Sequence, residues 1–194
     1  MAIRTKADEY TQLITLALED AAEYTMSTIF QRTGSQYLCT FQGFNYVHEV
    51  LTNGINTLTL LVKRRTPAKV RYITIGKPGR QETLFGSFCD DTVRAFSMEA
   101  DSLTELAQIK LVGPWQVLWD SQRSQLILAD WDYDKLSDKI ICMTVSNDRK
   151  EFELKETALD AGTWIIAWDQ IDEHGLVCFD FYKRELIRYT ITSF

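Results

Sequence analysis

Residues 113–136 of this chain read GPWQVLWDSQRSQLILADWDYDKL, and residues 162–186 read GTWIIAWDQIDEHGLVCFDFYKREL. Each stretch contains two tryptophans four positions apart, a following aspartate and a second apolar run. The residues that align are Trp115 with Trp164, Trp119 with Trp168, and Asp120 with Asp169. This similarity predicts two copies of a four-stranded unit of roughly 49 residues, over about 90–137 and 138–187.

A unit of this length has the size of one propeller blade, but a propeller needs at least about four blades, so two copies cannot close one. We therefore favour a duplicated half-sheet, with its halves packed face to face or joined edge to edge. The alternative is that two tryptophan-rich hairpins resemble each other without a duplication. In either case, tryptophans at i and i+4 of a strand lie on the same face.

From Asn56 onward, short runs rich in Val, Ile, Thr and aromatic residues alternate with Gly, Pro, Asn, Asp and Ser, which is typical of strands and turns. Their connections are too short for parallel crossovers, so we expect a mainly antiparallel meander. So many strands favour a strongly curved sheet, closed into a barrel or folded into a sandwich. The predicted strands are 57–64, 69–76, 83–88, 92–99, 104–112, 115–120, 125–131, 139–146, 151–159, 163–169, 175–182 and 186–193.

The N-terminal segment has a different pattern, because its apolar residues recur at helical spacing. These residues are Tyr10, Leu13, Ile14, Ala17, Leu18 and Ala21. They predict an amphipathic helix over about 6–30, within a helical segment 1–34 that packs on the β-rich body 56–194. Residues 37–51 fit either a strand or a short helix. The predicted fold class is therefore α+β, in a single domain that spans 1–194.

The composition is that of an ordinary globular protein, with 194 residues, 45% hydrophobic and 25% charged. No run of 18 apolar residues occurs, and the N-terminus lacks a signal-peptide core. Four dispersed cysteines without a C-x-x-C pair fit reduced thiols better than a disulfide framework or a zinc site. They are Cys39, Cys89, Cys142 and Cys178. We therefore expect a cytoplasmic protein without a membrane segment.

The sequence contains no recognised catalytic or cofactor-binding motif. Cys39 and His48 could be imagined as a nucleophile and its base, but a thiol among aromatic residues would have its pKa raised by burial. The acidic stretch 130–134, D-W-D-Y-D, could attract a hard cation, although it lacks the glycine and glutamate of an EF-hand loop. We predict no catalytic residue, no metal site and no cofactor.

The strongest feature of the charge pattern is a basic segment in a chain whose net charge is −6. No acidic residue occurs between Glu49 and Glu82. The basic residues there are Lys63, Arg64, Arg65, Lys69, Arg71, Lys77 and Arg80. We predict that they lie on one hairpin, which could bind a nucleic-acid backbone, a phosphate ligand or an acidic protein. The structural alternative is an edge hairpin whose charges prevent strand addition.

These observations favour a non-catalytic intracellular binding protein that recognises another macromolecule, most simply another protein, through the basic hairpin and an aromatic sheet face. The aromatic candidates are Trp115, Trp119, Trp131, Trp164 and Trp168. The basic hairpin could instead bind a phosphate-bearing or nucleic-acid partner. No membrane partner is expected. The alternative function is a carrier of a hydrophobic small molecule or chromophore in a lipocalin-like barrel. An enzyme of unidentified class is the third hypothesis.

Overall fold

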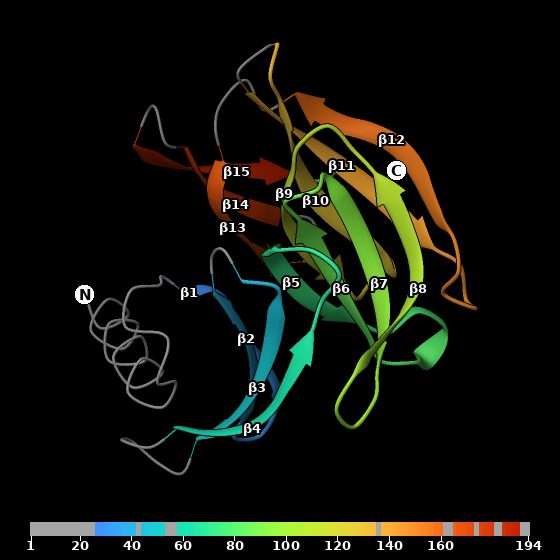
Figure 1. Cartoon of the computed structure of the whole chain (residues 1–194). Helices are drawn as coiled ribbons and strands as arrows, with labels where there is room; N and C mark the ends of the chain where they lie inside the picture. The colour runs from blue at the N-terminus through green and yellow to red at the C-terminus, as the bar shows by residue number, and fades with distance from the viewer. Residues whose placement is uncertain are drawn as a thin grey trace.

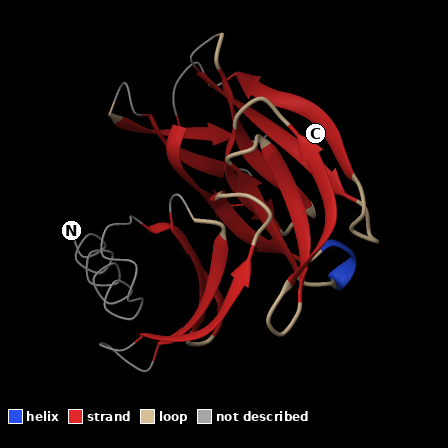
Figure 2. Ribbon diagram, viewed as in Figure 1, coloured by secondary structure: helices blue, strands red, loops and turns tan. Residues whose placement is uncertain are grey.

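The computed structural model describes residues 26–41, 44–52, 58–134, 137–160, 165–172, 175–180 and 184–190. Within these residues, the only helical element is the short 3-10 turn η1 (Pro78–Arg80), and the other elements are β-strands (Figure 2). The strands form four antiparallel sheets, each built from strands that are consecutive in the sequence (Figure 1).

The sheets are numbered in chain order. Sheet 1 contains β1 (Met26–Thr33), β2 (Gln36–Phe41), β3 (Tyr46–Thr52) and β4 (Leu58–Arg65). Sheet 2 contains β5 (Val70–Gly76), β6 (Thr83–Phe88), β7 (Thr92–Met98) and β8 (Leu103–Lys110). Sheet 3 contains β9 (Pro114–Asp120), β10 (Gln125–Asp132), β11 (Ser137–Val145) and β12 (Phe152–Asp160). Sheet 4 contains β13 (Ile165–Asp172), β14 (Gly175–Asp180) and β15 (Glu185–Thr190).

The first strands of the four sheets lie next to one another. Strand β5 contacts β1 on one side and β9 on the other, and β9 also contacts β13. Each sheet therefore extends outward from a shared row of first strands. Faces of sheets 1, 2 and 3 pack against one another, so that the second and third strands of these sheets are largely buried, whereas the outer strands β4, β8 and β12 have exposed residues.

One irregularity recurs near the start of every first strand. In sheet 2, Val70 pairs with Phe88 and Tyr72 pairs with Ser87, so that Arg71 is an extra residue. A similar register shift leaves an extra residue at Ser27 in β1 and at Ile166 in β13, and in β9 it places Trp115 and Gln116 opposite the single residue Ala129. Such a β-bulge bends the strand and changes the direction of the extra side chain. Its recurrence indicates that the four sheets share one plan.

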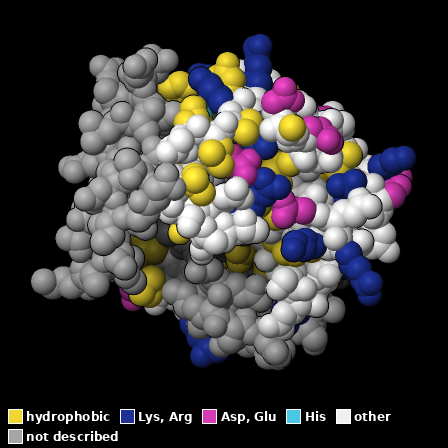
Figure 3. All heavy atoms as spheres, turned by 90° about the horizontal axis from the view of Figure 1, so that it is seen from below, with side chains coloured by type: hydrophobic (Ala, Val, Ile, Leu, Met, Phe, Trp, Pro, Cys, Tyr) yellow, Lys and Arg dark blue, Asp and Glu magenta, His cyan; other side chains and the backbone are white. Residues whose placement is uncertain are grey.

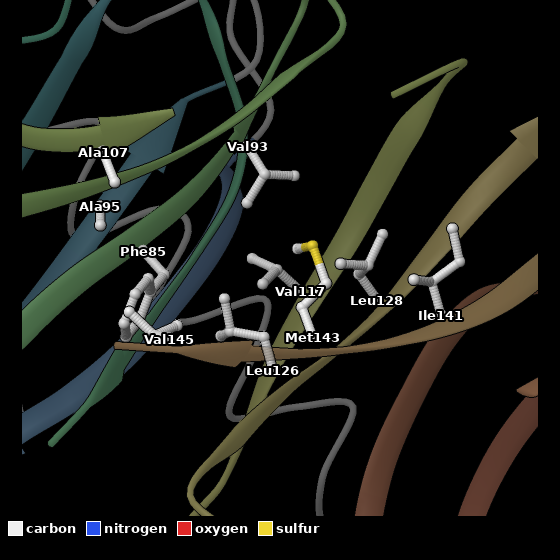
Figure 4. Packing of buried hydrophobic residues seen from close by; sticks show 10 residues of the cluster. All are labelled: Phe85, Val93, Ala95, Ala107, Val117, Leu126, Leu128, Ile141, Met143 and Val145. Atoms are coloured by element: carbon white, nitrogen blue, oxygen red, sulfur yellow. The ribbon is translucent and has the colours of Figure 1, made fainter. Parts of the chain in front are cut away.

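The main hydrophobic core lies between sheets 2 and 3 (Figure 4). Sheet 2 contributes Phe85, Val93, Ala95 and Ala107, and sheet 3 contributes Val117, Leu126, Leu128, Ile141, Met143 and Val145. A second cluster joins sheet 1 to sheet 2, with Leu38 and Val47 packed against Val70, Ile73 and Leu84. Burial of these apolar surfaces contributes roughly 25 cal/mol of stabilising free energy per Å². This contribution holds successive sheets together.

The predicted α+β class is wrong. Within the described residues the fold is all β, and β1 begins at Met26, inside the range predicted as a helix. Its sequence MSTIFQRT contains Thr, Ile and Phe, which favour a strand, and β2 supplies the pairing partner. The apolar residues that predicted the helix, Tyr10 to Ala21, lie outside the described residues. No helix in the described part of the chain has the length and apolarity needed to cross a membrane.

The sheet was predicted to close into a barrel or to fold into a sandwich, and the closed barrel is wrong, because the strands in the described part of the chain form separate sheets and do not pair around a ring. The predicted basic hairpin is not formed either. Strand β4 pairs with β3 in sheet 1, and β5 pairs with β6 in sheet 2. Residues 66–69 therefore connect two sheets and are not the turn of a hairpin.

The two similar tryptophan-rich stretches form β9–β10 and β13–β14, the first two strands of sheets 3 and 4. The unit predicted over 90–137 combines β7 and β8 of sheet 2 with β9 and β10 of sheet 3. Superposition of 90–137 on 138–187 stays a prediction.

Candidate binding surface

The connections between strands alternate between the two ends of each sheet, because neighbouring strands are antiparallel. One end carries the connectors between sheets, residues 66–69 and 111–113, together with the turns β2–β3, β6–β7 and β10–β11. We call this the connection end. The opposite end carries η1 and the turns β7–β8, β9–β10 and β11–β12.

A series of backbone hydrogen bonds joins the loops of the connection end across three sheets. The amide of Thr66 donates to the carbonyl of Asn45, and the amide of Cys89 donates to that of Lys69. The same pair of bonds recurs one sheet later, from Leu111 to Asp91 and from Trp131 to Gly113. The four donor to acceptor distances are 2.9 Å. The loops therefore form a connected rim whose backbone is held by these bonds.

Exposed apolar side chains gather at one part of this rim. Val112 is 54% exposed and Tyr133 is 59% exposed. A Cβ atom at Gly113 would lie 3.0 Å from the Trp131 carbonyl oxygen and 3.4 Å from the Tyr133 ring, so the connector and the turn are in close contact. Sequence reasoning missed Val112 and Tyr133, although Y133 stands in the D-W-D-Y-D stretch that was considered for its acids.

The acids of that stretch have separate roles in the structure. Asp130 is 5% exposed and accepts a 2.8 Å hydrogen bond from the Gly113 amide. Asp132 forms a 2.6 Å ion pair with Lys139, and Asp134 is exposed. Burial raises the pKa of Asp130, against the opposing effect of the Gly113 and Val112 amides. Among the described residues, no group of three potential metal ligands is found.

The seven basic residues predicted as one patch divide into four groups. Arg65 and Lys69 are exposed at the connection end, whereas Lys77 and Arg80 are exposed at the opposite end. Lys63 lies over the Tyr46 ring, with its Nζ 4.2 Å from the ring centroid. Arg64 and Arg71 are held by contacts within the protein. Figure 3, a view from below, shows basic side chains interspersed with acidic and apolar ones, without a single basic field.

Arg64 is a structural residue between sheets 1 and 2. It is 3% exposed, forms a 2.8 Å ion pair with Glu49, and donates to the carbonyl oxygens of Glu99 and Ala100. Glu49 also accepts from Arg32 at 2.8 Å. Burial alone would raise the pKa of Glu49, but the hydrogen bonds from Arg64 and Arg32 outweigh it and hold that pKa below its ordinary value. Arg64 is thus unavailable to a partner.

Arg71 is the extra residue of the β5 bulge, and its side chain reaches the next first strand, β9. Nη1 donates to the Pro114 carbonyl at 2.8 Å, and Nη2 lies 3.3 Å from Oδ1 of Asp91. The guanidinium carbon lies 5.8 Å from the centroid of the Trp115 ring. The structure therefore brings together one predicted basic residue and one predicted aromatic residue at the connection end. Asp91, which sequence reasoning missed, completes the group.

The other predicted aromatic residues are placed differently. Trp119 stacks on Phe85 of sheet 2 and belongs to the contact between sheets, while Trp131 is half-buried on the rim. Trp115 contacts Arg71 of sheet 2, and Trp119 contacts Phe85 of the same sheet. That the two tryptophans share one strand face stays a prediction. Trp168 lies on β13, where only the backbone is described, and Trp164 lies outside the described residues.

Cys39 and His48 are directly opposite each other on β2 and β3. Burial raises the pKa of the Cys39 thiol to about 12. Burial, followed by the charge on Lys63, lowers the pKa of His48 to about 4. Both groups are therefore neutral near pH 7, and neither is activated as a nucleophile or as its cationic partner. Cys39, Cys89 and Cys142 are free thiols.

No protein-family model and no curated protein sequence matches this chain. Solved structures do resemble it. A putative 6-phosphogluconolactonase from Bacteroides uniformis ATCC 8492 matches with a TM-score of 0.65 and 12% identity, over 87% of this chain and 51% of that one. A protein from Lactobacillus plantarum matches with a TM-score of 0.52 and 13% identity, over 82% of this chain and 54% of that one.

The fold is of the β-propeller type. The likeness to these structures agrees with the row of first strands and the repeated four-stranded meanders, which are the features of propeller blades. At such low identity the likeness concerns the fold alone. The chain spans about half the length of the two structures that it resembles.

Proposed function

We propose that this protein is a non-catalytic binding protein that recognises another protein through the connection end of its propeller-type sheets. The observation that carries the proposal is the exposure of Val112 and Tyr133 on a rim whose loops are fixed by backbone hydrogen bonds. Loops held by a rigid scaffold are common binding surfaces. Exposed Arg65 and Lys69 on the same end add charges that can orient a partner.

The chemistry of the described residues supports binding over catalysis. The opposed Cys39 and His48 are both neutral near pH 7, and the acids of the 130–134 stretch are occupied in capping and ion pairing or exposed to water. A carrier function loses its basis, since it depended on a lipocalin-like barrel. The name of the Bacteroides uniformis neighbour suggests 6-phosphogluconolactone hydrolysis as a second candidate, supported by likeness of fold only.

The proposal can be tested without a known partner by selecting binders from a displayed random peptide library. Selected peptides should lose affinity when Tyr133→Ser or Val112→Ser is introduced, by roughly five- to thirtyfold for a side chain at the centre of an interface. Lys77→Glu and Arg80→Glu, at the opposite end, are the matched controls and should leave affinity unchanged. Peptides that respond only to the opposite end, or turnover of 6-phosphogluconolactone by the purified chain, would contradict the proposal.

A further inference from the structure

Arg71 differs from the other basic residues of its segment in the way that it is held. The bulge directs its side chain toward β9, where it contacts the Pro114 carbonyl and the Trp115 ring, and the carboxylate of Asp91 in the β6–β7 turn lies beside the guanidinium. The side chain is 15% exposed. A cation that is already oriented and mostly shielded from water binds an anion with little loss of conformational freedom.

The ion pair with Asp91 is loose. Its N to O distance is 3.3 Å, whereas Arg94 lies 2.6 Å from Asp90 and Arg64 lies 2.8 Å from Glu49. Charge-assisted hydrogen bonds are usually about 2.7–2.9 Å long. Asp91 is also 37% exposed, so water competes for its carboxylate. An incoming carboxylate can therefore displace it at small cost.

Three further features favour an acidic segment of a protein as the group that displaces Asp91. Guanidinium is planar and has five N–H donors, which match the two oxygens of a carboxylate. Lys69, two residues before Arg71, is exposed and can attract a second acid. Asp90, the nearest acid in sequence to Asp91, already pairs with Arg94, so it does not compete with the partner's carboxylate for Arg71.

We propose that Arg71 is the anchor for a carboxylate of the partner, which takes the place of Asp91 on the guanidinium. The partner segment is acidic and carries an apolar side chain that can rest on Val112 and Tyr133. This inference rests on the proposed function, and it adds the chemistry that is recognised. Asp91 acts as an internal competitor that keeps Arg71 oriented before the partner binds.

The side-chain N–H signals of Arg71, in the full chain labelled with nitrogen-15 arginine, report directly on this exchange. Sodium glutarate is the carboxylate probe, glutaramide is its uncharged control, and sodium phosphate tests the alternative anion. Glutarate should shift the Arg71 signal in a saturable way, and glutaramide should not. Asp91→Asn should tighten glutarate binding by about two- to fivefold, the range for removal of an exposed ion pair. Thermal melting of each variant shows whether it is folded.

A peptide selected at the connection end separates this inference from the proposed function. Its binding should weaken in Arg71→Gln and weaken less in Arg71→Lys, which keeps the charge but not the planar fork. If Tyr133→Ser weakens the peptide while Arg71→Gln does not, the inference is wrong and the proposed function stands. If Asp91→Asn leaves glutarate affinity unchanged or lowers it, Asp91 is no competitor. A shift with phosphate but not with glutarate also overturns the inference.

Discussion

The indole of Trp119 lies flat against Phe85, with ring centroids 5.4 Å apart and an interplanar angle of 8°. Trp119 belongs to the first strand of sheet 3, and Phe85 belongs to sheet 2, so this stack joins two neighbouring blades. Gly76 makes room for it. A Cβ atom at position 76 would lie 2.6 Å from Cε3 of Trp119, which is closer than van der Waals contact permits.

Gly76→Ala should therefore destabilise the protein, because the methyl group must displace the indole from its stack. Overpacking of this kind typically costs about 1–3 kcal/mol in the free energy of unfolding. Urea denaturation monitored by circular dichroism measures the loss. The control is the same substitution in a Trp119→Ala background, which lacks the Cγ and ring atoms that the methyl group would meet, so that the cost should largely vanish. An equal cost in both backgrounds would show that the indole is not the cause.

Asp130 caps the connector between sheets 2 and 3 by accepting hydrogen bonds from the Gly113 and Val112 amides. Asp130→Ala would leave these amides without their acceptor and should cost about 1–3 kcal/mol of unfolding free energy. Asp130→Asn keeps an acceptor oxygen and removes a buried charge, so its loss should be smaller. Equilibrium urea denaturation at pH 7 compares the two. Equal losses would mean that the carboxylate charge is needed and that the hydrogen bonds are not the main contribution.

His48 should make the stability of the protein sensitive to mild acid. It is 4% exposed, its Nδ1 has no hydrogen-bond partner among the described residues, and burial lowers its pKa from 6.5 to about 4. Between pH 6.5 and about pH 4, His48 binds a proton in the unfolded chain but not in the folded chain. Stability is therefore complete above pH 6.5 and is lost as the pH falls toward 4, by roughly 3 kcal/mol in total.

The control for this prediction is His48→Gln, which cannot titrate. The urea midpoint of the wild-type chain should fall between pH 6.5 and 5, while that of the variant stays nearly constant. Glu49 adds its own loss only at lower pH, because its pKa is held below the ordinary value of 4.5. Parallel curves for the two proteins between pH 6.5 and 5 would assign the sensitivity to another group.

The strand positions after residue 56 could be predicted from the sequence, because Gly, Pro, Asn and Asp separate runs of β-branched and aromatic residues. Their division into four sheets could not be predicted. Strand β6 is buried along its whole length, from Thr83 to Phe88, since both faces pack against neighbouring sheets. Such a strand has no polar and apolar alternation that would show which face is covered.

The first sheet was predicted only in part, because residues 37–51 fitted either a strand or a short helix. The β3 sequence YVHEVLT has polar residues in its middle, as a short amphipathic helix would. In the structure, His48 and Glu49 are both buried, and Arg64 neutralises Glu49 from the neighbouring strand. A partner supplied by the tertiary structure is invisible in the local pattern. The same holds for Arg71, whose contacts with Asp91 and Pro114 come from other strands.

Hydrogen exchange with mass-spectrometric detection, measured with and without a peptide selected for binding, locates the surface that the peptide covers. Exchange should slow at the connection end, in residues 66–71, 89–91, 111–115 and 130–134. The opposite end, residues 77–82, 99–102, 121–124 and 146–151, should exchange at unchanged rates and serves as an internal control. Protection confined to the opposite end would contradict the assignment of the connection end as the binding surface.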